Sequence, residues 1–496
     1  MAAALGLQRI QGGRIGENLV ALGAIDADVL NGFLRRSLVG PKDIAATGID
    51  EADLLALLMK LIYSYRLEKV GQFTDAFKLS QNIVMDLTRL AVGRQLLYTL
   101  GAHSSDAMME TRYALTDEGR RWTVDAMQRS GYVGPAPVTL KDFVERVKRQ
   151  RPASERITAE RVREAISQLS IEENLVERIG PALNSGRAIL FYGPPGNGKT
   201  SLAMSFASVF HDMIHVPYAI IVEGQIIRFY DPRIHLPFGT DDGSEQNEEV
   251  SSFRRETHDQ RWVPCRRPFV VTGGELTLDM LDMRYESVGH YYEAPLHMKA
   301  LGGCFFIDDL GRQQTSPTDI LNRWIVPMES RVDYLKLHTG TSFAIPFEEL
   351  VIFATNKDAE DLIDAAFLRR IPYKIEVGPP NLEQYRRIFE MECERQNLPL
   401  NDEVFDFIVY MIQEEKGLDL AAFHATFIID QVVTTCRFLG VEPELRSPYI
   451  DYAINNLRVR RDPSVEGKPN HRSGPHGNWL AIESRKQFAV KSDRSA

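Results

Sequence analysis

The residue types best suited to chemistry are concentrated in the glycine-rich segment 193–200, which reads GPPGNGKT. It matches the pattern GxxxxGK[ST], in which glycines let the backbone turn tightly so that its N–H groups point at phosphate oxygens. In this pattern Lys199 reaches the β- and γ-phosphates as a point charge, and the Thr200 hydroxyl is a ligand for Mg²⁺. We therefore expect a site for nucleotide phosphates. Its residues are Gly193, Pro194, Pro195, Gly196, Asn197, Gly198, Lys199, Thr200 and Ser201.

The sequence on either side supports this interpretation. The apolar run AILFY, which predicts a strand over 189–192, precedes the glycines, and SLAMSFASVF, which has an apolar helical face, follows them. A helix that begins at the loop directs the positive end of its dipole at the same anion. The alternative is a chance glycine-rich turn that contains a lysine, and such a turn needs no strand and helix in this order.

Two aspartates follow another apolar run, in GGCFFIDDLGR. The run predicts a buried strand, with Asp308 and Asp309 at its carboxyl end. A nucleotide site needs acidic groups to hold the metal and to activate water. We expect Asp308 to hold Mg²⁺ through water, and Asp309 to orient and deprotonate the attacking water. An ordinary acidic turn at the end of a strand is the alternative.

Three more candidates follow along the chain. Asn356 ends the apolar run ELVIFAT, and it would hold the lytic water or the γ-phosphate on the side opposite Asp309. The alternative for Asn356 is an Asx turn that leaves a strand. Arg369 and Arg370 lie in DAAFLRRIPYKIEV, on a short helix that leads into a last strand. Either they act on a phosphate or they form a basic pair on the surface.

These side chains require a sheet whose strand ends meet. Residues 157–380 alternate apolar runs with helical patterns, which predicts βα units and a parallel sheet, and 381–458 read as helices only. The fold class expected is therefore α/β, a parallel sheet between helices, with an all-helical region after it and a mainly helical N-terminal region. Strands are expected at 189–192, 218–222, 268–273, 304–308 and 349–355.

The rest of the chain divides by pattern into further parts. They are a helical module at 1–70, a winged-helix-like unit at 71–135, a linker at 136–156 and a disordered tail at 459–496. In the winged-helix-like unit, a short strand at 113–115 is followed by Thr116, which predicts a helix cap. The linker is inferred from a Pro/Gly turn and a basic end, and the tail from its few large apolar residues.

Composition excludes several classes of protein. Of the 496 residues, 44% are hydrophobic and 25% are charged, as in soluble globular proteins. The net charge of −10 gives no bulk attraction to nucleic acid or to an anionic membrane. The four cysteines form no CxxC pair, so we expect a reducing compartment. Because no apolar run approaches the ~20 residues of a membrane span, and no signal peptide is evident, we expect a cytoplasmic protein without membrane insertion.

Taken together and in order, GPPGNGKT, FIDD, ATN and FLRR resemble the motifs of AAA+ ATPases, over about residues 157–458. The resemblance implies ATP and Mg²⁺ as cofactors, hydrolysis of ATP, a helical lid at 381–458, and a homo-oligomeric ring, expected to be a hexamer. It also implies that Arg369 or Arg370 crosses to the γ-phosphate of a neighbouring subunit, where its charge stabilises the transition state. The sequence does not distinguish the two arginines.

Two segments are similar to elements of the MoxR-like and pre-sensor-hairpin subgroup. Residues 273–303 look like its helix-2 insertion, and YLKL and FAIPF around HTGT predict a hairpin just before the strand that ends at Asn356. The resemblance implies that such elements face the central pore of the ring and couple the nucleotide state to a partner. The alternative is that both are ordinary surface elaborations.

The chain departs from the AAA+ pattern at two places. Asp309 stands where many relatives carry glutamate, so its carboxylate is one methylene shorter, and either the water lies closer or hydrolysis is slow. No arginine occupies the start of the lid helix in GLDLAAFHATFIIDQ. His424 is the nearest polar residue there, and we expect it to be a histidine on the helix surface.

The N-terminal 37 residues, with Arg14, Gly16, Gly23 and Ser37, resemble the N-terminal domain of type II secretion and type IV pilus assembly ATPases. In some of those proteins the arginine-containing turn binds cyclic di-GMP. Only one short copy of the motif is present here, so a helical docking module is the alternative.

In the winged-helix-like unit, a recognition helix would need exposed basic and amide residues. The segment VMDLTRLAVGRQLLYTL is mostly apolar, which favours protein docking over DNA binding.

The function expected from these features is an ATP-hydrolysing ring motor that remodels a protein partner in a chaperone-like way. The N-terminal resemblance suggests that the partner belongs to envelope secretion or pilus assembly. Two alternatives stay open. One is a nucleic-acid-directed AAA+ ATPase or regulator, and the other is a nucleotide-gated scaffold with slow turnover.

Overall fold

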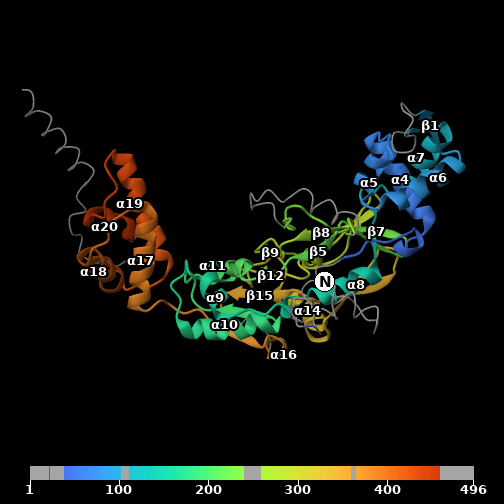
Figure 1. The fold of residues 1–496 in the computed structure, drawn as a ribbon. Coiled ribbons are helices and arrows are strands. Elements are labelled where there is room, and N and C mark those ends of the chain that lie inside the picture. The colour runs from blue at the N-terminus through green and yellow to red at the C-terminus, as the bar shows by residue number, and fades with distance from the viewer. Residues whose placement is uncertain (1–21, 23–37, 102–110, 239–257, 359–364, 458–496) are drawn as a thin grey trace, which may run out of the picture. The chain divides into compact units, whose positions relative to one another are not determined.

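The computed structural model describes residues 22, 38–101, 111–238, 258–358 and 365–457 (Figure 1). These residues divide into two compact units, which are described one at a time. The first unit holds the residues up to 165, then 172–193 and 199–376. The second holds 166–171, 194–198 and the residues from 377 onward.

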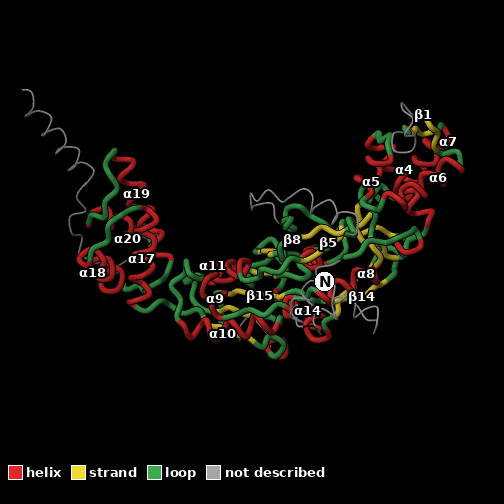
Figure 2. Tube along the Cα trace, in the orientation of Figure 1, coloured by secondary structure: helices red, strands yellow, loops and turns green. Residues whose placement is uncertain are grey.

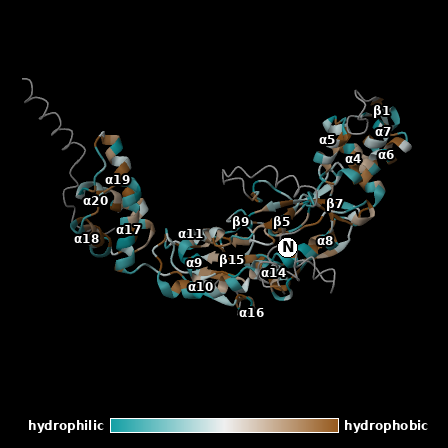
Figure 3. Ribbon diagram, viewed as in Figure 1, coloured by the Kyte–Doolittle hydropathy of each residue, from teal (hydrophilic) through white to brown (hydrophobic). Residues whose placement is uncertain are grey.

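A five-stranded parallel sheet forms the centre of the first unit. In spatial order its strands are β16 (Tyr373–Glu376), β4 (Ile189–Tyr192), β15 (Leu350–Thr355), β12 (Cys304–Ile307) and β9 (Phe269–Thr272). Every neighbouring pair is parallel. β12 and β15 are buried along their whole length, which is why their sequences are continuous apolar runs rather than alternating ones. Figure 3 colours each described residue by its hydropathy. The carboxyl ends of the five strands meet at one edge.

Helices pack on this sheet and complete its core. They are α9 (Ala159–Ala165), α10 (Glu173–Ser185), α11 (Lys199–Ser205), α13 (Leu296–Lys299), α14 (Pro317–Ser330) and α16 (Ala365–Leu368). α10 packs on β16, and α11 packs on β15. Phe305, Phe353 and Trp324 of α14 lie fully buried in the core. The predicted α/β fold class is therefore confirmed.

A second five-stranded sheet belongs to the same unit. Its strands are β10 (Arg284–Glu286), β11 (Tyr291–Glu293), β7 (Gln225–Arg228), β6 (Ala219–Val222) and β3 (Val138–Thr139). β6 covers residues 219–222 of the run 218–222, which we expected in the central sheet. An apolar run predicts a strand but does not say which sheet accepts it. β5 (Ile214–Pro217) and β8 (Trp262–Cys265) form a separate antiparallel pair.

The segment 136–156, for which the sequence predicts a linker, is folded. It contains β3, α8 (Leu140–Arg149) and a 3₁₀ turn at Pro152–Ser154. The Thr139 side chain caps α8 by accepting a hydrogen bond from the Asp142 N–H. Phe143 and Val147 are buried, while Lys148 and Arg149, whose charge suggested a linker, are exposed.

A helical module with one hairpin lies N-terminal to these sheets. It consists of α4 (Glu51–Tyr65), α5 (Val70–Phe77), α6 (Gln81–Gly93), β1 (Leu97–Gly101), β2 (Arg112–Leu115) and α7 (Asp117–Arg129). Leu54, Phe73 and Leu87, from three different helices, share one hydrophobic core. The boundary expected near residue 70 therefore falls inside a single core. Thr116 caps α7 as predicted, because its side chain accepts from the Gly119 N–H.

The hairpin expected before β15 is present, formed by β13 (Val332–Lys336) and β14 (Ser342–Pro346).

The second unit is helical (Figure 2). Its helices are α17 (Leu382–Gln396), α18 (Asp402–Tyr410) with a π-helical turn at Met411–Glu415, α19 (Phe423–Leu439) and α20 (Ser447–Asn455). Across the described residues of both units, no helix combines the length and the apolarity that crossing a membrane requires.

Candidate nucleotide site

The glycine-rich loop connects the end of β4 to the start of α11. Gly193, Gly196 and Gly198 adopt φ angles of +134°, +79° and +84°. These are left-handed conformations, which glycine adopts without the steric cost that a Cβ would add. The glycines at these positions thus meet a backbone requirement of the loop, as expected from the pattern. Ser201, in the first turn of α11, is exposed.

Lys199 is buried at the first position of α11. Its Nζ donates to the Gly193 carbonyl oxygen at 2.9 Å, so the ammonium group lies along the loop. Burial lowers the pKa of Lys199, while the carboxylates of Asp309 and Asp308 act in the opposite direction. The ammonium group therefore interacts electrostatically with both aspartates and donates a hydrogen bond to the loop. This is the environment in which a phosphate-binding lysine is expected.

The two predicted magnesium ligands come into direct contact. The Thr200 hydroxyl donates to Asp308 Oδ2 at 2.7 Å, although 108 positions separate the two residues. The parallel order β4–β15–β12 produces this proximity. The start of α11 and Asp308 both lie at the carboxyl edge of the sheet, after β4 and β12 respectively. Hydroxyl and carboxylate oxygens are the hard donors that Mg²⁺ prefers, together with water and substrate phosphates. The donor set therefore fits the ion.

No group of three or more His, Cys, Asp and Glu side chains arranged to hold a metal occurs within the described ranges. Mg²⁺ usually takes only one or two carboxylates from a protein and fills the other positions with water and phosphate oxygens. Two protein oxygens beside a phosphate loop are consistent with that habit.

Asp309 has a left-handed backbone, with φ of +48°. Its Oδ1 accepts from Asn356 Nδ2 at 2.6 Å, and its N–H donates to Asp308 Oδ1 at 2.9 Å. Arg312 Nη1 lies 3.9 Å from Asp309 Oδ2, and both of these side chains are solvent-exposed. Asn356 was expected on the side of the phosphate opposite Asp309, whereas in the structure its side-chain amide bonds directly to the Asp309 carboxylate.

Gln313 is a residue of this region that the sequence did not single out. Its Nε2 lies within hydrogen-bond distance of three carbonyl oxygens, those of Asp308 at 3.0 Å, Asp309 at 3.3 Å and Gly273 at 3.3 Å. Its Oε1 accepts from the Gly311 N–H at 2.8 Å. No motif marks this glutamine, and its contact with Gly273 depends on how β9 lies beside β12.

The two arginines differ in their surroundings. Arg370 Nη2 lies 3.1 Å from Glu329 Oε2 on α14, with the glutamate largely exposed. Arg369 is exposed to solvent. In a single chain Arg370 is thus paired toward α14, and this surface ion pair is weak enough, at about 0–1 kcal/mol, to exchange for another anion.

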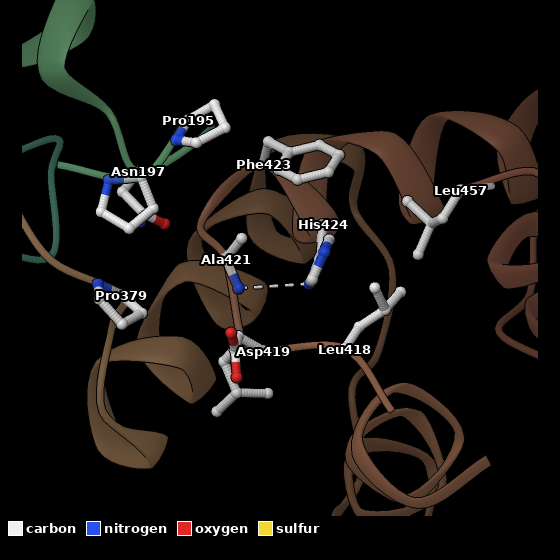
Figure 4. Close-up of a pocket in the computed structure, with 11 residues that line it drawn as sticks. Pro195, Asn197, Pro379, Leu418, Asp419, Ala421, Phe423, His424 and Leu457 are labelled. Carbon is white, nitrogen blue, oxygen red and sulfur yellow. Dashed lines mark hydrogen bonds between the residues drawn. The ribbon is translucent and has the colours of Figure 1, made fainter. Parts of the chain in front are cut away.

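The second unit contains a pocket of about 250 Å³ (Figure 4). It is lined by Pro194, Pro195, Asn197, Pro379, Leu418, Asp419, Leu420, Ala421, Phe423, His424 and Leu457. Two main-chain donors at the start of α19 hold the loop: Phe423 N–H donates to the Gly196 carbonyl oxygen at 2.9 Å, and Ala422 N–H to Asn197 Oδ1 at 3.3 Å. The loop segment 194–198 is therefore tied to the beginning of α19.

His424 is buried, which corrects the expectation of a histidine on the helix surface. Its Nδ1 accepts from the Ala421 N–H at 3.3 Å and lies 3.2 Å from the Tyr385 hydroxyl. Burial lowers the pKa of His424 to about 4. The ring is thus neutral at physiological pH, and it packs in the helical core because α19 turns this position toward α17.

A buried ionic cluster joins the hairpin to the segment 273–303. Asp333 of β13 accepts from His297 Nε2 at 2.8 Å and from Arg323 Nη1 of α14 at 2.7 Å. Arg323 Nε also reaches Asp282 Oδ1 at 3.4 Å. Burial by itself would raise the pKa of Asp333, but the bonds from His297 and Arg323 lower it to about 2. The carboxylate is therefore ionised and holds three elements together.

The tip of the hairpin is held as well. The His338 ring stacks on Tyr285 of β10 at 3.9 Å between centroids, and its Nδ1 bonds to the Tyr292 hydroxyl. On the other side of this strand pair, the Tyr291 ring packs against Tyr132, next to α7. The hairpin thus contacts the β10–β11 strands, and these strands in turn contact the helical module.

Comparisons with known proteins give limited matches. A family model described as "Domain of unknown function (DUF8689)" matches residues 381–456, within the helical second unit. Among proteins with curated descriptions, none matches this sequence significantly.

Solved structures with distant similarity include two proteins. One is the Holliday junction branch migration motor RuvB of Thermotoga maritima, with 14% identity and a TM-score of 0.31 over 58% of this chain and 70% of that one. The other is NtrX of Brucella abortus, with 11% identity and a TM-score of 0.35 over 75% of this chain and 66% of that one. At these levels of similarity neither structure assigns an activity to the chain.

Proposed function

We propose that the chain is an ATP phosphohydrolase of the AAA+ type. In the proposed reaction the oxygen of a water molecule attacks the γ-phosphorus of ATP, the bond between that phosphorus and the β,γ-bridging oxygen breaks, and ADP and phosphate leave. Asp309 accepts a proton from the water, Asn356 fixes the Asp309 carboxylate, and Lys199 neutralises charge on the phosphates. The observation that carries the proposal is the contact of the Thr200 hydroxyl with Asp308 Oδ2, one residue from Asp309.

Magnesium would be held by Thr200 and Asp308. When bound, the ion neutralises charge on the phosphate oxygens of ATP. The choice of ATP as the nucleotide rests on the resemblance to AAA+ ATPases.

The decisive experiment measures nucleotide binding and phosphate release by the purified chain with Mg²⁺ and with excess EDTA. We expect binding of ATP and Mg²⁺-dependent release of phosphate. If the chain binds no adenine nucleotide at any protein concentration, the proposal is wrong.

We further propose that the chain works as a homo-oligomeric ring, expected to be a hexamer, in which Arg369 or Arg370 of one subunit completes the site of the next. The support is that both arginines lie at the end of α16, with Arg369 exposed and Arg370 in a weak surface ion pair. A fixed positive charge supplied in this way stabilises the transition state of phosphoryl transfer.

The work driven by ATP is proposed to be remodelling of a protein partner, with envelope secretion or pilus assembly as the pathway suggested by the N-terminal resemblance. The support is the continuous contact from α14 through Asp333 and His338 to the helical module. In this proposal a movement of α14 would be passed through these contacts to the helical module. The proposed cyclic di-GMP site, with Arg14 and Gly16, lies outside the described residues.

The exposed face of α6 favours a protein partner over DNA. Its charged residues include Asp86 and Arg89, which pair with each other at 2.9 Å, and the face carries no basic stripe. A recognition helix needs free basic and amide groups aimed at a groove.

A nucleotide-gated scaffold with slow turnover is the second candidate. It is favoured by the aspartate at position 309, whose carboxylate is one methylene shorter than that of the glutamate found in many AAA+ relatives and therefore reaches less far toward an attacking water. Binding of ATP with turnover far slower than exchange of the nucleotide would favour this candidate.

A further inference from the structure

The side-chain amide of Gln313 lies where the ends of β9 and β12 meet the Asp308–Asp309 turn. Its Nε2 faces the carbonyl oxygens of both aspartates and of Gly273, which follows β9. Its Oε1 accepts from the N–H of Gly311, in the same turn. One half-buried side chain therefore contacts both sides of the turn and the neighbouring strand.

The turn needs such support because its backbone is strained. Asp309 is a residue with a Cβ at φ of +48°, a conformation that persists only when surrounding contacts enforce it. On the β15 side, the Leu310 N–H donates to the Ala354 carbonyl oxygen at 2.7 Å, and the Thr355 hydroxyl donates to the Leu310 carbonyl oxygen at 3.0 Å. Gln313 supplies the corresponding contacts on the β9 side. The turn is thus held between two strands.

We propose that Gln313 is a positioning residue for ATP hydrolysis, which holds the Asp309 carboxylate in its working orientation without touching the nucleotide. The proposal rests on the proposed ATPase function. The proposal assigns the holding role to the N–H donors of the Gln313 amide. A glutamate at this position would have the same shape but would present an acceptor oxygen to three carbonyl oxygens.

The proposal separates turnover from binding. The phosphates would be held by the loop at 193–200, whereas the hydrogen bonds of Gln313 described above go to the 308–311 turn and to Gly273, so the affinity for ATP should change little. A displaced Asp309 would lower the rate of the chemical step, since misplacement of a catalytic group by about 1 Å costs on the order of 100-fold. A loss of kcat with KM unchanged is the signature of an interaction needed only in the transition state.

The test compares Gln313→Glu with Gln314→Glu, which makes the same charge change at the exposed neighbouring position. For Gln313→Glu we expect kcat to fall roughly 10- to 100-fold, with KM and the Kd for ATP within about threefold of the parent chain. Gln314→Glu should match the parent. Gln313→Met, which is uncharged and of similar shape, should also lose turnover, and it carries the test if Gln313→Glu fails to fold.

Hydrogen exchange of the peptide that covers 308–313 gives a readout that does not depend on activity. Exchange of the Gly311 amide should rise in Gln313→Met and stay at the parent level in Gln314→Glu. The proposal is overturned if Gln313→Glu and Gln313→Met turn over ATP at the parent rate, or if KM rises while kcat is unchanged. An inactive parent chain would instead contradict the proposed function, and this inference with it.

Discussion

The Thr200 hydroxyl and Asp308 Oδ2 lie 2.7 Å apart, at the adjoining ends of α11 and β12. One residue follows the phosphate loop, and the other follows a strand two places away in the sheet. In the proposed function these two side chains would hold a magnesium ion, and the charges of Asp309 and Asp308 act on the nearby Lys199. The following predictions start from this relationship.

Replacing the loop lysine should weaken nucleotide binding. Lys199→Ala deletes a charge-assisted contact to phosphate worth about 1.5–3 kcal/mol, so the Kd for ATP should rise ~10- to 100-fold. Isothermal titration of the purified chain measures this value. Lys336→Ala, which removes an exposed lysine from β13, is the matched control and should bind as the parent does. Equal affinities of the two variants would remove the phosphate-loop assignment.

Replacing the proposed base should separate binding from hydrolysis. Asp309→Asn keeps the shape and the amide partner but accepts no proton, so ATP should still bind while phosphate release falls roughly 10²- to 10⁴-fold. Asp319→Asn, at an exposed position of α14, makes the same chemical change away from the site and should stay active. If Asp309→Asn turns over ATP normally, another group is the base.

Turnover should depend on contact between subunits. Arg369→Ala and Arg370→Ala are made separately, and each is mixed with the parent chain. In the mixture that contains the variant lacking the crossing arginine, the fractional loss of activity should exceed the fraction of variant subunits. The full loss in unmixed rings should reach about 10³-fold. Arg387→Ala, on the second unit, controls for loss of a surface charge. Strictly proportional loss in both mixtures would argue against a shared site.

The buried Asp333 cluster should give stability a dependence on low pH. The pKa of Asp333 is lowered from 3.8 to about 2 in the folded chain, so its contribution is complete above pH ~4 and is lost as the pH falls toward 2. Asp333→Asn removes the buried carboxylate that accepts from His297 and Arg323, leaves Arg323 only its contact with the exposed Asp282, and should cost about 3–5 kcal/mol of unfolding free energy at neutral pH. Urea titration at several pH values measures both effects.

Asp282→Asn is the internal control for that cluster. Asp282 contacts the same arginine at 3.4 Å, but its side chain is 64% exposed, so its loss should cost no more than about 1 kcal/mol. Equal costs for the two variants would mean that burial does not distinguish the two carboxylates.

Local sequence determined the loop, the strands and several caps. Gly193, Gly196 and Gly198 meet a backbone requirement that only a few consecutive residues set, and the run before Asp308 is apolar because a strand buried on both faces needs apolar side chains throughout. Thr116 caps its helix for an equally local reason. Such features were predictable because the interactions that cause them span only a few positions.

Tertiary structure alone decided the rest. The choice of sheet for 218–222, the folding of 136–156, the burial of His424 and the contact of Gln313 with Gly273 all depend on residues far away in the chain. An apolar run indicates that a segment will be buried, and a polar side chain indicates that it will need a hydrogen-bond partner. Neither indicates which distant element provides the burial or the partner. That choice is made only when the whole core packs, because side-chain volumes and hydrogen bonds from many segments must then be satisfied together.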